Sequence, residues 1–233
     1  MLDKKLIKKN FQKSLNTYNK NAFVQKKMAQ KLASMLKKQS FKKILEIGSY
    51  TGLLTFEIVQ NVKFEKYFAI DIVDSFDFIK DLSDKISFKQ TSIEDFLTEE
   101  KFDLIVANAS LQWAGDFNQT ILKLKSMLNT GGQILFSTFG KQNLIEIKEA
   151  FDVGLNYYSI EELKNLFPYF SIASEIEKLK FNSSIDILKH LKNTGVNSLY
   201  SSRINFKTLK QGLKILDEKF NSTLTYNPIY ITN

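Results

Sequence analysis

Short apolar runs and longer amphipathic stretches alternate along most of this chain. Runs of strand length, typical of strands buried on both faces, lie at residues 43–47, 67–71, 86–90, 104–107 and 133–138. Other stretches repeat their apolar positions every three or four residues, as helices do, at residues 53–60, 117–128 and 143–151, with a short helix expected at 74–80. Because strands and helical segments follow one another in five consecutive units, the pattern predicts a doubly wound α/β fold with a parallel sheet.

Helical patterns continue beyond this core. Residues 1–40 place apolar side chains at near-helical spacing, from Phe23 and Val24 through Met28 to Leu32 and Leu36. Near the other end, a helix is expected at residues 160–167, followed by strands at 174–181 and 224–232. These two strands bring the predicted sheet to seven, mostly parallel.

The last two predicted strands are separated by residues 183–221, about forty residues with two helical stretches, which is too long for a loop in a compact domain. We therefore expect a single domain over residues 1–233, with an N-terminal helical lid at 1–40 and a helical cap inserted at 183–221.

Composition narrows the kind of protein. The chain has 233 residues, of which 43% are hydrophobic and 25% charged, so it has room for a sizeable core. It contains no cysteine, which excludes disulfides, thiolate catalysis and thiolate metal sites, and we expect no metal. The apolar runs are far shorter than the roughly 20 residues of a membrane span, and residues 1–11 do not resemble a secretory signal, so a cytoplasmic location without membrane binding is expected.

The net charge of +8 leaves two interpretations open. It could serve an anionic partner, or it could reflect a bias toward lysine in a chain whose one arginine is Arg203. The one histidine, His190, lies beside leucines in a predicted cap helix, so we expect it to have a surface or packing role rather than to act as a base.

Candidate chemistry is concentrated where the first strand ends. The segment ILEIGSYTG, residues 44–52, places Glu46 before a turn bounded by Gly48 and Gly52, with Ser49 between them and a helix beginning next. Glycines let bare backbone approach a ligand at such a turn. Asp71 closes the second strand 19 residues after Gly52, where a doubly wound sheet places a carboxylate that binds ribose hydroxyls.

An acidic residue before the turn suits a cationic ligand better than a pyrophosphate. S-adenosylmethionine combines a sulfonium, an ammonium and a ribose without phosphate, and the pattern resembles motif I of the class I methyltransferases, which have a Rossmann-like fold. Tyr50 departs from the middle glycine of that motif. The alternative is a simple strand-to-helix turn.

Ligands in open α/β sheets bind at the carboxyl ends of the strands. From position, we expect Ile72 to stack on adenine, Ser92 and Ile93 to lie by its amino edge, and Asn108 and Ala109 to line the methionine portion near the reacting methyl. The alternative for Ser92 and Asn108 is an ordinary role as turn residues.

Several longer segments make the resemblance narrower. They include FQKSLNTYNKNAFVQKKMAQKL near the start, NASLQW and FSTFG after the fourth and fifth strands, LKHLKNTGVNS in the cap and LTYNPIYI at the end. Together they are similar to the malonyl-acyl-carrier-protein O-methyltransferases of biotin synthesis over nearly the whole chain. Departures are Tyr50, Asn19 where the family usually has aspartate, and residues 141–143 in a turn that normally contains Pro or Gly.

This resemblance implies S-adenosylmethionine as cofactor, bound in part by Gln25, and an acidic malonyl-acyl carrier protein as substrate. A malonyl carboxylate is already ionised at pH 7, so its methylation needs no general base. It must still be recognised, and Tyr18 and Arg203 are the candidate catalytic residues for this task. We expect a monomer without nucleic-acid binding. The alternatives are a class I methyltransferase for another small acid, and a nucleic-acid-binding protein that keeps only the fold.

Overall fold

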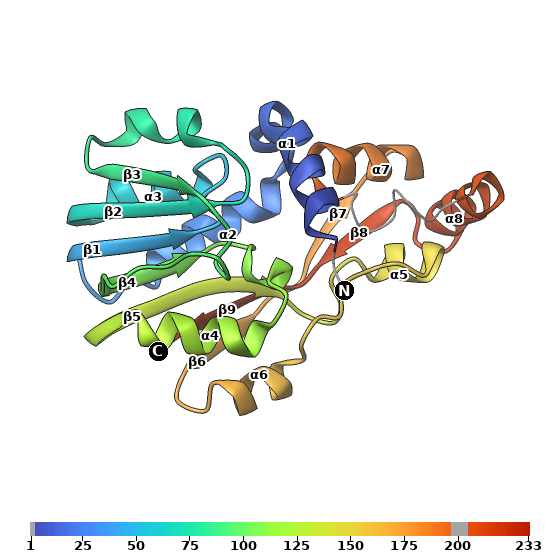
Figure 1. The fold of residues 1–233 in the computed structure, drawn as a ribbon. Helices are drawn as coiled ribbons and strands as arrows, with labels where there is room; N and C mark the ends of the chain where they lie inside the picture. The colour runs from blue at the N-terminus through green and yellow to red at the C-terminus, as the bar shows by residue number, and fades with distance from the viewer. Residues whose placement is uncertain (1–2, 197–204) are drawn as a thin grey trace.

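A computed structural model describes residues 3–196 and 205–233. Its centre is a seven-stranded sheet of order β3-β2-β1-β4-β5-β9-β6, in which β9 runs antiparallel to both of its neighbours (Figure 1). The strands are β1 Ser40–Ile47, β2 Lys63–Asp71, β3 Ile86–Gln90, β4 Phe102–Ala107, β5 Leu128–Phe139, β6 Ser171–Ser174 and β9 Pro228–Thr232. The predicted doubly wound, mostly parallel sheet is thereby confirmed.

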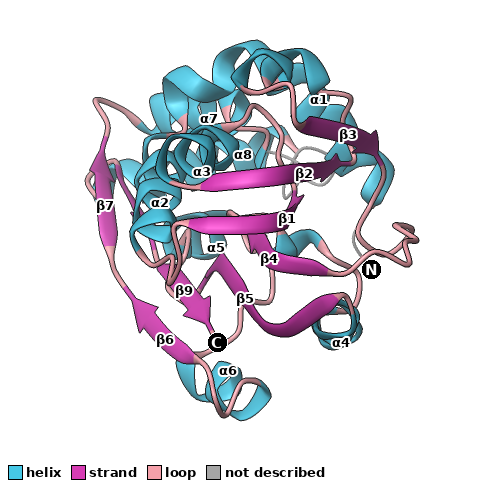
Figure 2. Ribbon diagram, turned by 90° about the vertical axis from the view of Figure 1, so that its left-hand side faces the viewer, coloured by secondary structure: helices cyan, strands magenta, loops and turns pink. Residues whose placement is uncertain are grey.

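Helices cover both faces of the sheet (Figure 2). One face carries α2 Phe23–Ser34 and α3 Leu53–Asn61, and the other carries α4 Phe117–Ser126 and α6 Ile160–Leu166. Successive side chains of β1 point to opposite faces of the sheet, so this strand packs against the helices on both faces. Ile44 packs with α2 and α3, whereas Leu45 packs with α4.

The first helix, α1 Lys4–Asn21, lies outside these layers, across the carboxyl ends of the strands (Figure 1). The Asp3 carboxylate caps it by accepting from the backbone N–H groups of Lys5 and Leu6, both at 3.0 Å. The chain then bends at Ala22 and continues as α2, so the predicted N-terminal helical region consists of two helices with different neighbours.

The two last predicted strands are both interrupted, which corrects the sequence prediction. Residues 174–181 divide between β6 and β7 Glu177–Lys180, and residues 224–232 divide between β8 Thr223–Tyr226 and β9. Asn227 lies at the break and donates from Nδ2 to the Ser174 hydroxyl and the Glu175 carbonyl, both over 2.9 Å. The chain thereby leaves the main sheet as a separate two-stranded ribbon, β7-β8.

This ribbon carries the cap helices α7 Ser184–Asn193 and α8 Phe206–Glu218. Helix α8 packs on α5 Ile145–Phe151, and a methyl group on Gly212 would overlap the Phe151 ring. Helix α7 packs against α1, where the Thr17 hydroxyl donates to the Asn193 carbonyl over 2.9 Å. His190 lies 2.8 Å from the Tyr226 hydroxyl, and burial lowers its pKa to about 4, so the imidazole is neutral at pH 7.

Several core elements differ from the prediction in type or boundary. Strands β1 and β2 begin three and four residues before their predicted starts at Lys43 and Tyr67. The expected helix at residues 74–80 consists of two short 3₁₀ turns, η1 Phe76–Phe78 and η2 Lys80–Leu82. Strand β5 begins five residues earlier than the predicted start at Gln133, since Leu128 pairs with Phe102 ahead of an irregularity in the ladder. None of the helices in the described residues is both long and apolar enough to cross a membrane.

Candidate functional site

A cleft of about 820 Å³, solvent at its mouth included, lies where the carboxyl ends of the parallel strands meet α1. Helix α1 lines one wall, and the segments after β1, β2, β3 and β4 line the others. The lining residues are Lys4, Ile7, Phe11, Tyr18, Ile47, Gly48, Tyr50, Ile70, Asp71, Ile72, Thr91, Ser92, Ile93, Glu94, Asn108, Ala109, Ser110, Leu111, Trp113 and Ala114.

The turn after β1 needs its glycines. Gly48 has φ +73°, and a Cβ there would overlap the side chain of Ser110, whose hydroxyl donates to the Ile47 carbonyl over 2.8 Å. Gly52 has φ +80° and forms the N-cap of α3. Gly48 lines the cleft and Gly52 does not. Gly52 therefore contributes to the shape of the turn and to the start of α3, without facing the cleft.

Two backbone N–H groups hold the Asp71 carboxylate in the cleft. Its Oδ2 accepts from the Tyr50 backbone N–H over 3.0 Å, and its Oδ1 accepts from the Val73 N–H over 2.8 Å. Burial raises the pKa of Asp71 to about 6, against the effect of these backbone donors. The carboxylate is therefore mostly ionised at pH 7, with lone pairs left for hydroxyl donors.

Glu46 lies elsewhere than the sequence led us to expect. It does not line the cleft, because its position in β1 turns the side chain toward α3. Its Oε2 accepts from the Thr55 hydroxyl over 2.6 Å and from the Tyr67 hydroxyl over 2.7 Å. Burial raises the pKa of Glu46 to about 7. The side chain supports the turn from inside the core instead of facing a ligand across the cleft.

The end of β4 is held by β5. The Asn108 Oδ1 accepts from the Ser137 hydroxyl over 2.7 Å, and its Nδ2 donates to the Gln25 carbonyl over 2.9 Å. Ala109, with φ +48°, donates its N–H to the Ser137 hydroxyl over 3.0 Å. Ser137 was missed by the sequence analysis because only the pairing of β4 with β5 brings it beside Asn108.

The segment after β3 forms another wall. The Ser92 hydroxyl donates to Asp95 over 2.7 Å, and Ile93 is buried. Glu94 was not singled out from sequence, yet it lines the cleft and pairs with Lys4 of α1 over 3.0 Å. This pair joins the wall after β3 to the lid.

Two of the predicted site residues each carry a buried polar atom without a partner within the described residues. The first atom is the Gln25 Oε1, and the backbone carbonyl of Gln25 accepts from Asn108. The second is the Ser49 Oγ, and Ser49 lies between two lining residues. Buried polar groups are normally hydrogen-bonded, so such atoms suit a polar ligand. Neither residue contributes to the lining itself.

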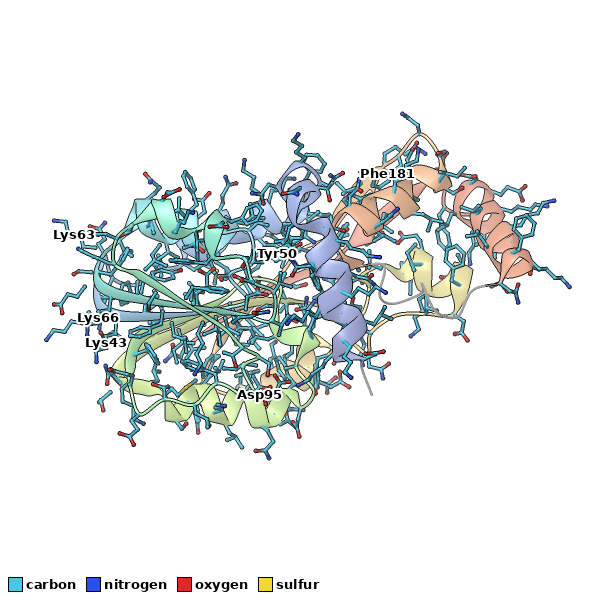
Figure 3. All side chains as sticks on the ribbon, turned by 45° about the horizontal axis from the view of Figure 1, so that its top comes forward. Lys43, Tyr50, Lys63, Lys66, Asp95 and Phe181 are labelled. Atoms are coloured by element: carbon cyan, nitrogen blue, oxygen red, sulfur yellow. The ribbon has the colours of Figure 1, made fainter. Side chains whose placement is uncertain are left out.

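Helix α1 closes the cleft with aromatic side chains. The Phe11 ring meets the Trp113 ring edge to face with centroids 5.6 Å apart, and Ile7 is buried next to it. Tyr18 is half-buried on the same wall, and burial raises the pKa of its phenol, which stays a hydrogen-bond donor at neutral pH. Figure 3 shows α1 in front of the strand ends, next to Tyr50.

The predicted site residues therefore fall into three groups. Those brought together in the cleft are Tyr18, Gly48, Asp71, Ile72, Ser92, Ile93, Asn108 and Ala109. Those around it without lining it are Gln25, Glu46, Ser49 and Gly52. Arg203 lies outside the described residues.

The buried Glu46 predicts a pH-dependent stability. Between pH 4.5 and about 7 the folded chain keeps a proton that the unfolded chain releases, so the free energy of unfolding falls as pH rises through this window. The free energy of unfolding of Glu46→Gln should not fall in this pH window. At pH 8 it should therefore exceed that of the parent chain by about 1–3 kcal/mol. Urea unfolding at pH 5 and pH 8 measures it, with the exposed Glu65→Gln as control. Equal pH slopes in Glu46→Gln and the parent chain would contradict it.

Comparison with known proteins agrees with this geometry. The methyltransferase domain family matches residues 19–197. The chain is 36% identical to a malonyl-[acyl-carrier protein] O-methyltransferase of Calditerrivibrio nitroreducens, covering 96% of this chain and 94% of the relative. It is 32% identical to the protein of that name from Chlorobium luteolum, covering 99% and 95%.

Solved structures show the same fold at low identity. The YcgJ protein of Bacillus subtilis matches with a TM-score of 0.65 at 11% identity, covering 88% of this chain and 97% of that one. The N-methyltransferase NodS of Bradyrhizobium japonicum, in complex with S-adenosyl-L-homocysteine, matches with a TM-score of 0.55 at 16% identity, covering 96% and 97%. Since relatives more than 30% identical match nearly the whole chain, this chain belongs to the malonyl-[acyl-carrier protein] O-methyltransferase family of methyltransferase-domain proteins.

Proposed function

We propose that this chain transfers the methyl group of S-adenosylmethionine to the free carboxylate of malonyl-acyl carrier protein, an early step of biotin synthesis. The observation that carries the proposal is the similarity to relatives of this name over 96% of the chain, at 36% identity. The strand-end cleft supports it, because it combines a ribose-type carboxylate with a glycine turn and an aromatic lid.

The residues present fit S-adenosylmethionine. Asp71 offers a carboxylate to the two ribose hydroxyls, and Ile72 and Ile93 offer apolar surface for adenine. The unpaired Gln25 Oε1 and Ser49 Oγ suit the ammonium and carboxylate of the methionine end. When bound, the sulfonium supplies an electrophilic methyl group.

The chain's own part in the reaction is to orient and desolvate. A malonyl carboxylate is ionised at pH 7 and is itself the nucleophile, so no side chain has to remove a proton. Ile7, Phe11 and Trp113 exclude water from the cleft, and the Tyr18 hydroxyl is the candidate donor that orients the carboxylate. The new bond joins a carboxylate oxygen to the methyl carbon as the sulfur–methyl bond breaks, leaving a methyl ester and S-adenosylhomocysteine.

The proposal is tested by incubating the protein with methyl-labelled S-adenosylmethionine and malonyl-acyl carrier protein. We expect label in the carrier fraction that mild base releases, as a methyl ester requires. Acetyl-acyl carrier protein, which has no free carboxylate, should stay unlabelled. Labelling of another small acid with none on malonyl-carrier would favour a different substrate, and RNA binding without any labelling would favour the nucleic-acid alternative.

Asp71 predicts the pH dependence of cofactor binding. Hydroxyl donors favour its ionised form, so affinity for S-adenosylmethionine should be full above pH 7 and fall toward tenfold per pH unit below about 6. Asp71→Asn should weaken binding about ten- to hundredfold at pH 8 and flatten this profile. Calorimetry from pH 5 to pH 8 measures both, with Glu46→Gln as the comparison. An unchanged affinity in Asp71→Asn would remove Asp71 from the cofactor site.

We further propose that the carrier docks on the outer face of α1. This helix carries six exposed lysines and no acidic residue. Within the described residues, Lys4 is the only one of the six that forms an ion pair, with Glu94. Lys5, Lys9, Lys13 and Lys20 lie opposite the face that covers the cleft, as their helical spacing requires. In the described part of the cap, by contrast, two lysines pair with the cap's own carboxylates, Lys189 with Asp186 and Lys214 with Glu218. An acidic carrier would therefore meet α1 more favourably than the cap.

Charge reversal tests this docking face. Lys9→Glu/Lys13→Glu should raise the KM for malonyl-carrier about tenfold, and added salt should reduce the difference. The kcat should stay near that of the parent chain, as should the KM for a small malonyl thioester without carrier. Lys63→Glu/Lys66→Glu is the matched control, since these lysines lie at the opposite end of the sheet (Figure 3). Equal KM changes in both pairs would contradict docking on α1.

A further inference from the structure

Tyr50 stands in the middle of the glycine turn with φ +43°. An L-residue in this left-handed region of backbone conformation is strained, and a glycine would avoid the strain. The resemblance described above leads one to expect glycine here, and glycine would suffice for a turn that only brings backbone to a ligand. The contacts of the Tyr50 side chain must therefore offset the backbone cost.

Those contacts all reach helix α1. The Tyr50 hydroxyl donates to the Phe11 carbonyl over 2.6 Å and lies 3.0 Å from the Ser14 hydroxyl. The Tyr50 ring meets the Tyr18 ring edge to face at 4.7 Å between centroids, and the Phe11 ring at 5.5 Å. Tyr50 is 8% exposed and Ser14 is 1% exposed, so these hydrogen bonds are shielded from water.

The other end of Tyr50 touches the cofactor side of the cleft. Its backbone N–H donates to the Asp71 Oδ2 over 3.0 Å. Tyr50 therefore connects two parts of the site. One is Asp71, whose carboxylate is expected to bind the ribose, and the other is helix α1, which covers the cleft. A second link lies next to it in sequence, where the Thr51 hydroxyl donates to the Asn19 Oδ1 over 2.6 Å.

We propose that Tyr50 is a positioning residue that fastens α1 over the cleft, so that the glycine turn and the lid respond together to S-adenosylmethionine. This inference rests on the proposed use of that cofactor. Because Phe11, Tyr18 and Tyr50 all line the cleft, a ligand bound beneath α1 lies against the residues that join α1 to the glycine turn. The hydroxyl slows exchange of the cofactor, whereas the methyl transfer itself does not use it.

A double-mutant cycle of Tyr50→Phe and Ser14→Ala tests the fastening. Each change keeps the backbone and removes one hydroxyl of the same contact. Tyr50→Phe should speed dissociation of S-adenosylmethionine five- to tenfold in stopped-flow measurements. The KM for the cofactor should rise while kcat at saturation stays near the parent value. The double variant should differ little from Tyr50→Phe alone, since coupled residues are not additive.

Hydrogen exchange gives a readout that does not depend on activity. Amides of α1 should exchange faster in Tyr50→Phe than in the parent chain, with and without S-adenosylmethionine, and faster still in Tyr50→Gly, which loses the ring contacts as well. Tyr230→Phe is the matched control, because that buried phenol donates to Glu175 in another part of the molecule.

The outcomes separate the two proposals. Unchanged α1 exchange and unchanged cofactor dissociation in Tyr50→Phe would overturn the fastening role, and fully additive effects of the two hydroxyls would do the same. If the parent chain does not bind S-adenosylmethionine at all, the proposed function fails, while faster α1 exchange in unliganded Tyr50→Phe would still support the fastening of the lid.

Discussion

The cleft depends on one constraint, the meeting of parallel strand ends around the Asp71 carboxylate. Strands β1, β2 and β4 lie side by side, so the turns that follow them converge on one edge of the sheet. The Tyr50 and Val73 backbone N–H groups hold the two oxygens of Asp71 in place, one from the turn after β1 and one from its own strand end. Both donors point inward, which fixes the carboxylate without placing a positive charge beside it. The site can therefore offer an anionic acceptor to a ligand that is itself positively charged.

The polar residues around Asp71 divide into those that face the cleft and those that support the turn from inside the core. Asp71 and Asn108 face the cleft, whereas Glu46 lies behind the turn and is hydrogen-bonded by Thr55 and Tyr67. Burial raises the pKa values of both carboxyl groups, to about 6 for Asp71 and about 7 for Glu46, and the negative charge of Asp71 also raises the pKa of Glu46. Each carboxyl group has its own donors, the Thr55 and Tyr67 hydroxyls for Glu46 and two backbone N–H groups for Asp71, and these hydrogen bonds offset part of the cost of burial.

Helix α1 and the helices α7 and α8 add further layers to the central sheet and its flanking helices. Helix α1 covers the strand ends, the cap helix α7 packs on α1, and Tyr50 ties α1 to the turn below it. Closure by aromatic side chains suits a reaction whose nucleophile is already ionised, since what remains to be supplied is orientation and the removal of water. The basic outer face of α1 lies directly above this closure, so the surface that would receive a carrier and the helix that shields the reaction are two faces of one element.

Local patterns in the sequence determined the fold class, the succession of strands and helices, and the cleft residues that directly follow strands, such as Asp71 and Asn108. They do so because burial on both faces produces apolar runs, and because a parallel sheet sends every strand end to the same edge. Only the tertiary structure decided which way the Glu46 side chain turns and that both of the last predicted strands break, one after Ser174 and the other at Asn227. It also decided that Lys4, Glu94, Ser137 and Tyr50 join elements far apart in the chain. These features depend on contacts between segments that are distant in the sequence. The spacing of residues along the chain does not indicate which face of a helix packs against which strand end.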